Sequence, residues 1–457
     1  MKKLIFFICS LTIIITSLVT PVSAQNYIDS VQTDKIKLNC KVDLLVSLDD
    51  GSVIVEKNAD TPVAPASLTK VMTALVVLKN EKDLSRKMVI SAEAIESLYG
   101  TGSSTSGLKV GEEISIYNML CCLLIPSGND AAVALAVEYG GSVAGFVEKM
   151  NATALALGCK NTNFENPHGL DSPNHKTTAN DLVLIAKEAL EYSEFQTIVA
   201  SNTYKLPETN MNKERTIVNT NFLISPYRVS YYNKNVKGIK TGSTEDAGKC
   251  LISYASKDGY NYMAVAMGGD QIDTDGDGIT ENQAFMDSNH MYNWAFKNLK
   301  YEIITQQGQF VCSVPLDYCS DYESAKLVAA TEVLALVPQG NDSESVSFNP
   351  VDVPEKLAAP LKKGDSAGKA EILFAGQVIG TVDLVVAEDA NYDLFLYIKS
   401  VILSSKTFIS IVVAVIVIFV VAYVAFFIYT NNKRKKQREI KMVKYNELKR
   451  NTQKKNK

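Results

Sequence analysis

Histidine, tryptophan and paired cysteine are scarce in this chain, and each shortage excludes a class of site. The 457 residues include three His and one Trp. A His-rich metal centre or a Ser-His-Asp hydrolase therefore has little material to work with. Eight Cys are present, but no C-x-x-C pair and no Cys/His zinc spacing. Cys9 lies in the apolar leader, so seven cysteines remain, and an odd number cannot all form disulfides. We therefore expect most of them to be buried free thiols, although Cys312 and Cys319 could pair locally.

Charge is distributed unevenly along the chain. The formal net charge is -4 at pH 7, yet residues 431–457 carry twelve Lys or Arg against two Glu. The main body is therefore strongly acidic, which excludes nucleic acid as its partner. With 46% hydrophobic and 21% charged residues, the chain is also too apolar to be disordered.

Both ends of the chain have the pattern of targeting segments. Residues 1–24 combine two lysines, an apolar run and small residues at a cleavage position, which is typical of a signal peptide. Phe408–Tyr429 is apolar and uncharged, and as a helix it would span about 33 Å. We expect a transmembrane helix at 407–430 and a basic tail at 431–457. Basic flanks stay inside, so the tail is expected in the cytoplasm against anionic lipid and the catalytic domain outside the cell membrane.

The region between these ends is expected to form two domains. Strands, then helices, then strands again predict an α+β domain at 25–300, an antiparallel sheet flanked by helices. Short β-type runs with turn signals predict a small β-rich domain at 301–395. The expected strands are Val42–Val46, Ser52–Glu56, Val236–Lys240, Gly248–Ser256 and Tyr260–Met267; the expected helices are Leu68–Lys79, Ile116–Leu124, Asp130–Tyr139, Val143–Leu157 and Ala179–Tyr192.

The tetrapeptide Ser67-Leu68-Thr69-Lys70 is the first candidate for chemistry. On a helix, residues i and i+3 share a face, so the Lys70 amine can reach the Ser67 hydroxyl. A serine needs such a base, and a lysine can act as one where burial or a second cation lowers its pKa. The helix N-terminus would add free backbone N–H groups for an oxyanion. Alone, the motif is weak evidence for catalysis, because a helix cap followed by a surface lysine has the same S-x-x-K sequence.

Two further segments complete a set. Ser127-Gly128-Asn129 lies between two helical patterns, where a hydroxyl and an amide can relay a proton and hold a peptide carbonyl; a turn with an N-cap is the alternative. Lys240-Thr241-Gly242 ends a β-type run, where a cation and a hydroxyl can bind a carboxylate and the glycine leaves room for substrate. The alternative there is an exposed strand end. The order and context of all three match the S-x-x-K, S-x-N and K-T-G set of penicillin-recognising serine enzymes.

On these motifs the chain resembles the serine-type D-alanyl-D-alanine carboxypeptidases of peptidase family S11, the low-molecular-mass penicillin-binding proteins. The resemblance covers about Val42–Lys300, and Ala359–Asp365 also resembles the C-terminal domain of these enzymes. Further landmarks in family order are Gly107–Gly111, Met150-Asn151, Leu157-Gly158, Asn166–Leu170 and Gly238–Gly242. The resemblance implies the penicillin-binding, β-lactamase-like transpeptidase fold.

The resemblance also implies a reaction. Ser67 would attack the carbonyl between the terminal D-alanines of a peptidoglycan stem peptide, with Lys70 as base, and β-lactams would acylate the same serine as inhibitors. No cofactor is implied. The remaining roles are proton transfer by Ser127, substrate orientation by Asn129, carboxylate binding by Lys240 and Thr241 beside Gly242, and an oxyanion hole from the N–H groups of Ser67 and Ser243.

One position departs from the family pattern. Ser243 stands where family members often carry a bulky residue before Thr244. A backbone N–H donor survives this change, but substrate preference could differ.

Two rival functions share the motifs. A class A β-lactamase adds a Glu that activates the deacylating water, but Glu-x-x-Leu-Asn is absent between Ser127 and Lys240. A non-catalytic β-lactam sensor would need an output module, for which the 27-residue tail is short, although it could recruit a partner.

Two other features invite functional readings. The start of a calcium loop is matched by Asp273, Asp275 and Asp277. Ala284 occupies the twelfth position, where such a loop normally has a bidentate Glu, so an acidic surface insertion is the simpler interpretation. No metal site is assigned with assurance. His168, in the segment that resembles a family loop, is interpreted as structural.

Overall fold

The computed structural model describes residues 36–273, 276, 278–339, 346–374, 377–404 and 406–455. The predicted signal peptide, like Asp275 and Asp277, lies outside these residues. The described chain forms two compact units. One holds the residues up to Thr305 with Glu332–Asn349 and Glu371–Thr381; the other holds Gln306–Thr331, Pro350–Ala370 and the residues from Val382 onward. The domain boundaries expected at 300 and 395 stay predictions.

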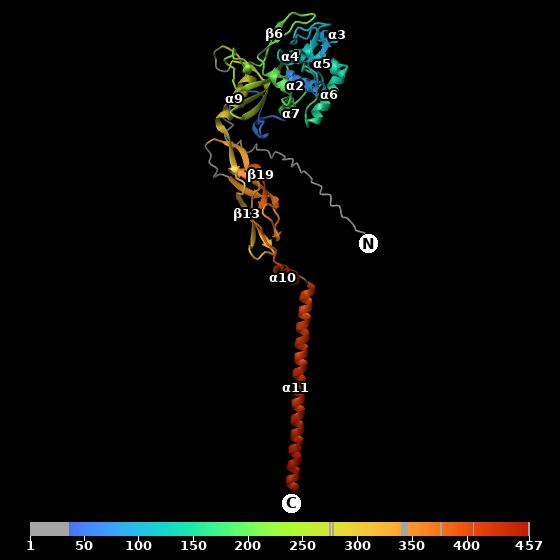
Figure 1. Ribbon diagram of the computed structural model, residues 1–457, viewed down its shortest axis with the longest axis vertical. Coiled ribbons are helices and arrows are strands. Elements are labelled where there is room, and N and C mark those ends of the chain that lie inside the picture. Colours follow the sequence, from blue (N-terminus) through green and yellow to red (C-terminus); the bar gives the residue numbers. More distant parts are fainter. Residues whose placement is uncertain are drawn as a thin grey trace, which may run out of the picture. The chain divides into compact units, whose positions relative to one another are not determined.

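A five-stranded antiparallel sheet lies at the centre of the first unit (Figure 1). Its strand order is β2-β1-β9-β8-β7, so the N-terminal hairpin pairs with strands about 200 residues later. The strands are β1 Val42–Ser47, β2 Val53–Lys57, β7 Val236–Thr244, β8 Gly248–Lys257 and β9 Tyr260–Gly269. The expected antiparallel sheet flanked by helices is confirmed.

Helices cover both faces of this sheet, which is why every residue of β1 is buried. Alternate residues point to opposite faces. Leu44 lies in the large core shared with α2 and the helical block, whereas Ser253 and the backbone of Ala264 bond to Tyr292 of α9. α9 therefore packs on one face and the helical block on the other.

The helical block follows the sequence patterns closely. Three of its helices follow a capping residue whose side chain accepts a hydrogen bond from the first turn, namely Ser115, Ser142 and Thr178. The helix expected to end at Tyr192 stops at Ala189, because Tyr192 has an extended backbone and starts a new helix. The helices are α2 Thr69–Asn80, α3 Ala92–Glu96, α4 Ile116–Leu124, α5 Asn129–Gly140, α6 Val143–Ala156, α7 Ala179–Ala189, α8 Ser193–Val199 and α9 Gln283–Asn298, with 3-10 turns at Ala66–Leu68 and Phe222–Ile224.

Three two-stranded sheets, with two to four residues in each strand, complete the first unit. A further pair, β12 with β15, belongs to the same unit by its contacts. The paired strands are β3 Lys87–Val89 with β4 Glu113–Ser115, β5 Thr203–Leu206 with β6 Arg215–Val218, β10 Gln271–Ile272 with β11 Glu281–Asn282, and β12 Leu299–Thr305 with β15 Val333–Pro338.

The second unit is β-rich, as expected. β14 pairs antiparallel with β13 and with the last residues of β19, and β17 adds a parallel edge to β13. A small core holds Leu316, Cys319, Ala325, Ala359 and Ala390. The six-stranded sheet holds β13 Phe310–Asp317, β14 Ser324–Ala329, β16 Val346–Pro350, β17 Leu357–Ala358, β18 Ser366–Phe374 and β19 Gln377–Val386. By their contacts, β16 up to Asn349, β18 from Glu371 and β19 up to Thr381 are counted with the first unit.

Two helices end the described chain, α10 Leu394–Ser404 and α11 Lys406–Lys455. α11 is long and apolar enough to cross a membrane: its apolar window has a mean hydropathy of 3.3 and none of that window is buried. This apolar helix is a candidate membrane span, in agreement with the expected anchor.

All seven cysteines among the described residues are free thiols. Six are buried and Cys312 is partly exposed. The interpretation of buried free thiols is confirmed for these, and the structure does not join Cys312 to Cys319.

Candidate functional site

Ser67 lies in the 3-10 turn that leads into α2. The preceding Ala66 has φ 47°, a left-handed conformation that is rare for a residue with a side chain. Gly169 packs against this turn so closely that a Cβ on it would lie 1.8 Å from the Ala66 carbonyl oxygen. The turn is thus held in a strained form that leaves Ser67 partly exposed between buried neighbours.

Lys70 is fully buried one turn after Ser67. Its Nζ lies 2.8 Å from the Ser67 Oγ and donates to the carbonyl of His168 at 2.7 Å. Burial lowers the pKa of Lys70 well below its ordinary value, and the positive charge of Lys240 lowers it further, while Asp130 acts in the opposite direction. A lowered pKa makes the neutral amine available, and the neutral amine can accept the serine proton.

The second motif forms the turn before α5. Ser127 has φ 65° and is nearly buried, and Asn129, the first residue of α5, is buried as well. A Cβ on Gly128 would lie 2.1 Å from the Ser106 Oγ, so only glycine fits there. Asp130 then accepts the backbone N–H groups of Ser106 and Leu108, which ties this turn to the preceding loop.

The third motif lies inside β7, which continues to Thr244 instead of ending at the motif. Lys240 is buried, its Nζ donates to the Thr241 carbonyl at 2.9 Å, and burial lowers its pKa to about 7. A Cβ on Gly242 would lie 3.0 Å from the Ser67 nitrogen, so the strand passes directly beside the Ser67 turn. The charge on Lys240 is also close enough to act on Lys70.

The residues after Gly242 face solvent. Ser243 is exposed and its Oγ accepts a hydrogen bond from Lys249 at 3.2 Å. Thr244 donates to Asp171 at 2.6 Å, which links the end of β7 to the loop that contains His168 and Gly169. That loop therefore touches both the serine turn and the lysine strand.

Sequence reasoning missed two supporting residues. Thr220 is hydrogen-bonded to Thr241 at 2.6 Å, which fixes the hydroxyl of the third motif. His175 is bonded through Nε2 to Thr69 at 2.8 Å, and Thr69 donates to the Ala66 carbonyl at 2.8 Å. Because Nδ1 of His175 accepts the Glu165 N–H, Nε2 carries the proton and donates. The spacing of these residues from the motifs gave no signal that they meet.

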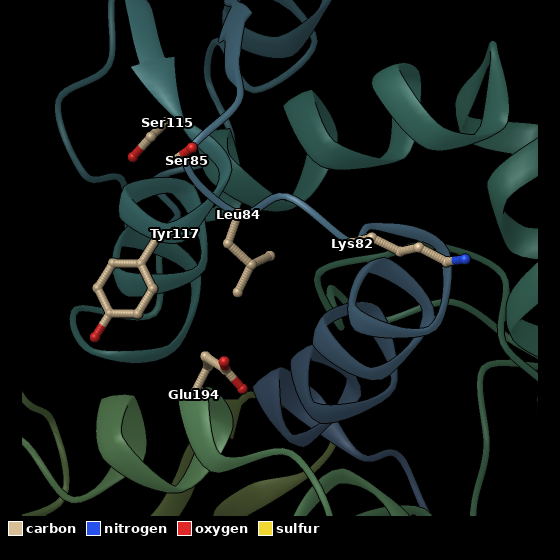
Figure 2. Close-up of a pocket in the computed structure, with 6 residues that line it drawn as sticks. All are labelled: Lys82, Leu84, Ser85, Ser115, Tyr117 and Glu194. Carbon is tan, nitrogen blue, oxygen red and sulfur yellow. The ribbon is translucent and has the colours of Figure 1, made fainter.

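The hollow drawn in Figure 2 lies elsewhere in the first unit. It is lined by Lys82, Leu84, Ser85, Ser115, Tyr117 and Glu194, with Leu84 pointing toward Glu194. It contains none of the three motifs, so the candidate site is defined by hydrogen bonds and burial around Ser67.

Comparisons with known proteins agree with this geometry. Residues 28–271 match the family model described as D-alanyl-D-alanine carboxypeptidase, and residues 302–392 match the C-terminal domain of penicillin-binding protein 5.

Similar proteins of known name point the same way. The chain is 31% identical to the D-alanyl-D-alanine carboxypeptidase DacF of Bacillus subtilis, covering 79% of this chain and 88% of the relative. It is also 31% identical to DacC of Escherichia coli, covering 76% and 83%. The structure of penicillin-binding protein 5 from Haemophilus influenzae superposes with a TM-score of 0.59 at 28% identity, over 78% of this chain and 98% of that one.

Proposed function

Because the chain belongs to the D-alanyl-D-alanine carboxypeptidase family, we propose that Ser67 is the nucleophile with which it removes the terminal D-alanine from peptidoglycan stem peptides. The enzyme is a carboxypeptidase of the cell wall. The observation that carries the assignment of Ser67 is the 2.8 Å contact with the fully buried Lys70, whose pKa burial holds well below its ordinary value.

Acylation begins with proton transfer from Ser67 to Lys70. The Ser67 Oγ bonds to the carbonyl carbon between the two D-alanines, and the backbone N–H groups of Ser67 and Ser243 hold the resulting oxyanion. The carbon–nitrogen bond then breaks, and the amine leaves as D-alanine after Ser127 passes it a proton. Ser127 recovers its proton from protonated Lys70. Lys70 then takes a proton from the water that attacks the ester and passes it to the departing Ser67 Oγ, so water replaces the proton that left with D-alanine.

Substrate binding is assigned to β7 and the turn before α5. Lys240, with its pKa near 7, becomes protonated when the terminal carboxylate of the substrate approaches, because a neighbouring anion favours the charged amine. Thr241, oriented by Thr220, donates to the same carboxylate. Asn129 orients the peptide, and Gly242 lets it lie along the strand beside Ser67.

β-Lactams acylate the same serine, because the ring amide replaces the peptide bond between the D-alanines. The arrangement of Glu165 favours a carboxypeptidase over a β-lactamase, since its carboxylate accepts hydrogen bonds from Ser172 and Asn174 within its own loop. It is therefore not arranged as the free water-activating Glu of a β-lactamase.

The apolar window of α11 anchors the enzyme as a single-pass membrane protein. Twelve Lys or Arg follow the apolar stretch, so the tail stays in the cytoplasm and the domain with Ser67 faces the cell wall. This orientation brings the enzyme to its extracellular substrate.

The function is tested with full-length protein by D-alanine release from a peptide ending in D-Ala-D-Ala, alongside fluorescent penicillin labelling. We expect labelling, slow turnover of the label and D-alanine release, all lost in Ser67→Ala. Fast penicillin hydrolysis without D-alanine release would instead identify a β-lactamase. Labelling with neither activity would identify a β-lactam sensor.

A further inference from the structure

A second set of reactive side chains lies on the α9 face of the sheet. Cys40 precedes β1, Asp43 is its second residue, and Asp287 lies on α9. All three are buried, and the thiol sulfur and one oxygen of each carboxylate lie within 4.8 Å of one another. None of the three belongs to the machinery around Ser67.

Within the part of the chain that the structure describes, polar atoms of this cluster have no hydrogen-bond partner. Among these residues, neither carboxylate oxygen of Asp43, which has no exposed surface, accepts a hydrogen bond. The nearest cation, Lys57 Nζ, is 3.7 Å from Asp43 and donates to the carbonyls of Leu38 and Cys40. Leaving a buried polar group without a partner typically costs about 1–3 kcal/mol, so such groups call for an explanation.

Gln283 adds a second unpartnered group. It is 1% exposed and lies one turn before Asp287 on the same face of α9. Neither its amide oxygen nor its amide nitrogen has a hydrogen-bond partner among the described residues. A Cβ placed on Gly269 would lie 2.9 Å from the Cys40 Sγ and 3.4 Å from the Gln283 Cβ. The side chains of Gln283 and Cys40 therefore both lie next to Gly269.

The electrostatics of the cluster favour a cation. Burial, with the charge of Asp287, raises the pKa of Asp43 to about 8, and burial with the two carboxylates raises the pKa of the Cys40 thiol. The neighbouring carboxylate charge thus disfavours ionisation of Asp43 and of the Cys40 thiol. A bound divalent ion reverses this balance and stabilises thiolate and carboxylate together.

We propose that Cys40, Asp43 and Asp287 bind one zinc ion, with the amide oxygen of Gln283 as the fourth ligand. One sulfur with oxygen donors suits zinc, which binds sulfur at about 2.3 Å and carboxylate oxygen at about 2.0–2.2 Å. Ligand atoms around such an ion lie about 3.5 Å apart, so the cluster needs only to contract modestly.

The backbone already orients one ligand. Asp287 accepts the N–H groups of Asn39 at 2.6 Å and Cys40 at 2.7 Å, and the Asn39 amide at 3.1 Å. Such outer hydrogen bonds fix a metal-binding carboxylate. The ion would cross-link the segment before β1 to α9, which is 247 residues away from Cys40, and so stabilise the sheet that carries Lys240.

The test uses full-length protein in detergent, purified through a histidine-free tag, stripped with a chelator and titrated in excess Ca²⁺, so that oxygen-only sites do not contribute. We expect one Zn²⁺ per chain, and with Co²⁺ as the probe a thiolate-to-metal charge-transfer band. Cys40→Ser should abolish the band and weaken zinc binding at least 100-fold, and Asp43→Asn at least tenfold.

Cys159→Ser is the matched control, since this buried thiol donates to the Asp181 carbonyl and a serine hydroxyl can replace it. It should bind zinc and cobalt as the wild type does. Fluorescent penicillin labelling shows whether each variant is folded, and Asp43→Asn supplies the comparison where Cys40→Ser does not fold. Substoichiometric zinc in the wild type, or wild-type zinc affinity in folded Cys40→Ser or Asp43→Asn, would overturn the proposal.

Discussion

At the scale of single residues, the proposed chemistry of this site depends on two buried lysines. Lys70 and Lys240 have almost no exposed surface, and burial is the largest cause of the lowered pKa of each. The motif letters predicted that Lys70 could reach Ser67, since i and i+3 share a helix face. They could not predict the burial, because it depends on chain segments far away in sequence, such as the loop that places the His168 carbonyl on Lys70.

Lys240→Gln should move the pH dependence of acylation. Removing the positive charge raises the pKa of Lys70, so the neutral amine forms at higher pH and the acidic limb of the profile shifts upward. The measurement is the second-order rate constant for fluorescent penicillin from about pH 4 to 9. Lys237→Gln, at an exposed position of the same strand, is the control and should leave the limb in place. An unshifted limb in Lys240→Gln would disprove the coupling of the two lysines.

We expect His175 to be a positioning residue, because its hydrogen bond to Thr69 leads on to the Ala66 carbonyl beside Ser67. His175→Ala leaves the Thr69 hydroxyl without its donor, and a lost buried hydrogen bond of about 1–3 kcal/mol predicts a fall in kcat of roughly tenfold with KM little changed. Burial lowers the pKa of His175 to about 4, so it is neutral at physiological pH and its protonation should not shape the profile there.

Steady-state D-alanine release compares His175→Ala with His290→Ala, whose ring is partly exposed and bonds to the Lys37 carbonyl. The control should keep the wild-type kcat. A wild-type kcat in His175→Ala would show that the bond to Thr69 has no part in positioning Ser67.

At the scale of elements, the sequence predicted helices that have a regular apolar pattern, but it did not predict a helix whose apolar positions are interrupted by polar residues. α4 has the predicted bounds, because a capping serine and an apolar run mark it. α9 was missed, since Asn, Ser, Asp and His residues of low helix propensity interrupt its apolar positions. Missing α9 also hid Asp287 and Gln283, so the cluster with Cys40 gave no sequence signal.

The close approach of β7 to the Ser67 turn predicts the effect of Gly242→Ala. The new Cβ would press on the Ser67 nitrogen at 3.0 Å and on the Pro65 carbonyl oxygen at 3.2 Å, which displaces the turn. We expect penicillin acylation to slow at least about tenfold, since small misplacements at a reacting centre cost large factors.

Gly259→Ala is the control for this variant. Gly259 has φ +88° in the turn between β8 and β9, with no atom within 4 Å of a new Cβ. It should cost about 1 kcal/mol of stability through the backbone and leave acylation unchanged. Equal acylation rates in the two glycine variants would contradict a tight approach of β7 to Ser67.

At the scale of the whole molecule, the second unit combines a β-rich part with a C-terminal apolar helix. A β-rich body precedes α10 and α11, and the apolar window of α11 has no burial among the described residues. The apolar run predicted this candidate span from the sequence, because bilayer thickness sets the length of a span directly.

Ending the chain after Ser404 should release the enzyme from membranes without loss of chemistry. Fractionation after carbonate extraction should find the full chain in the pellet and the shortened chain in the supernatant, with equal penicillin labelling of Ser67. A shortened chain that stays in the pellet would show that another segment anchors the protein.

Activation of Ser67 by Lys70 is tested most directly by peptide mapping after penicillin treatment. The wild type should carry the acyl group on the peptide that contains Ser67. Folded Lys70→Ala, with an unchanged Tm, should acylate about 10²–10⁴-fold more slowly, the range expected for loss of a general base. An adduct on another residue, or acylation of Lys70→Ala at the wild-type rate, would contradict this mechanism.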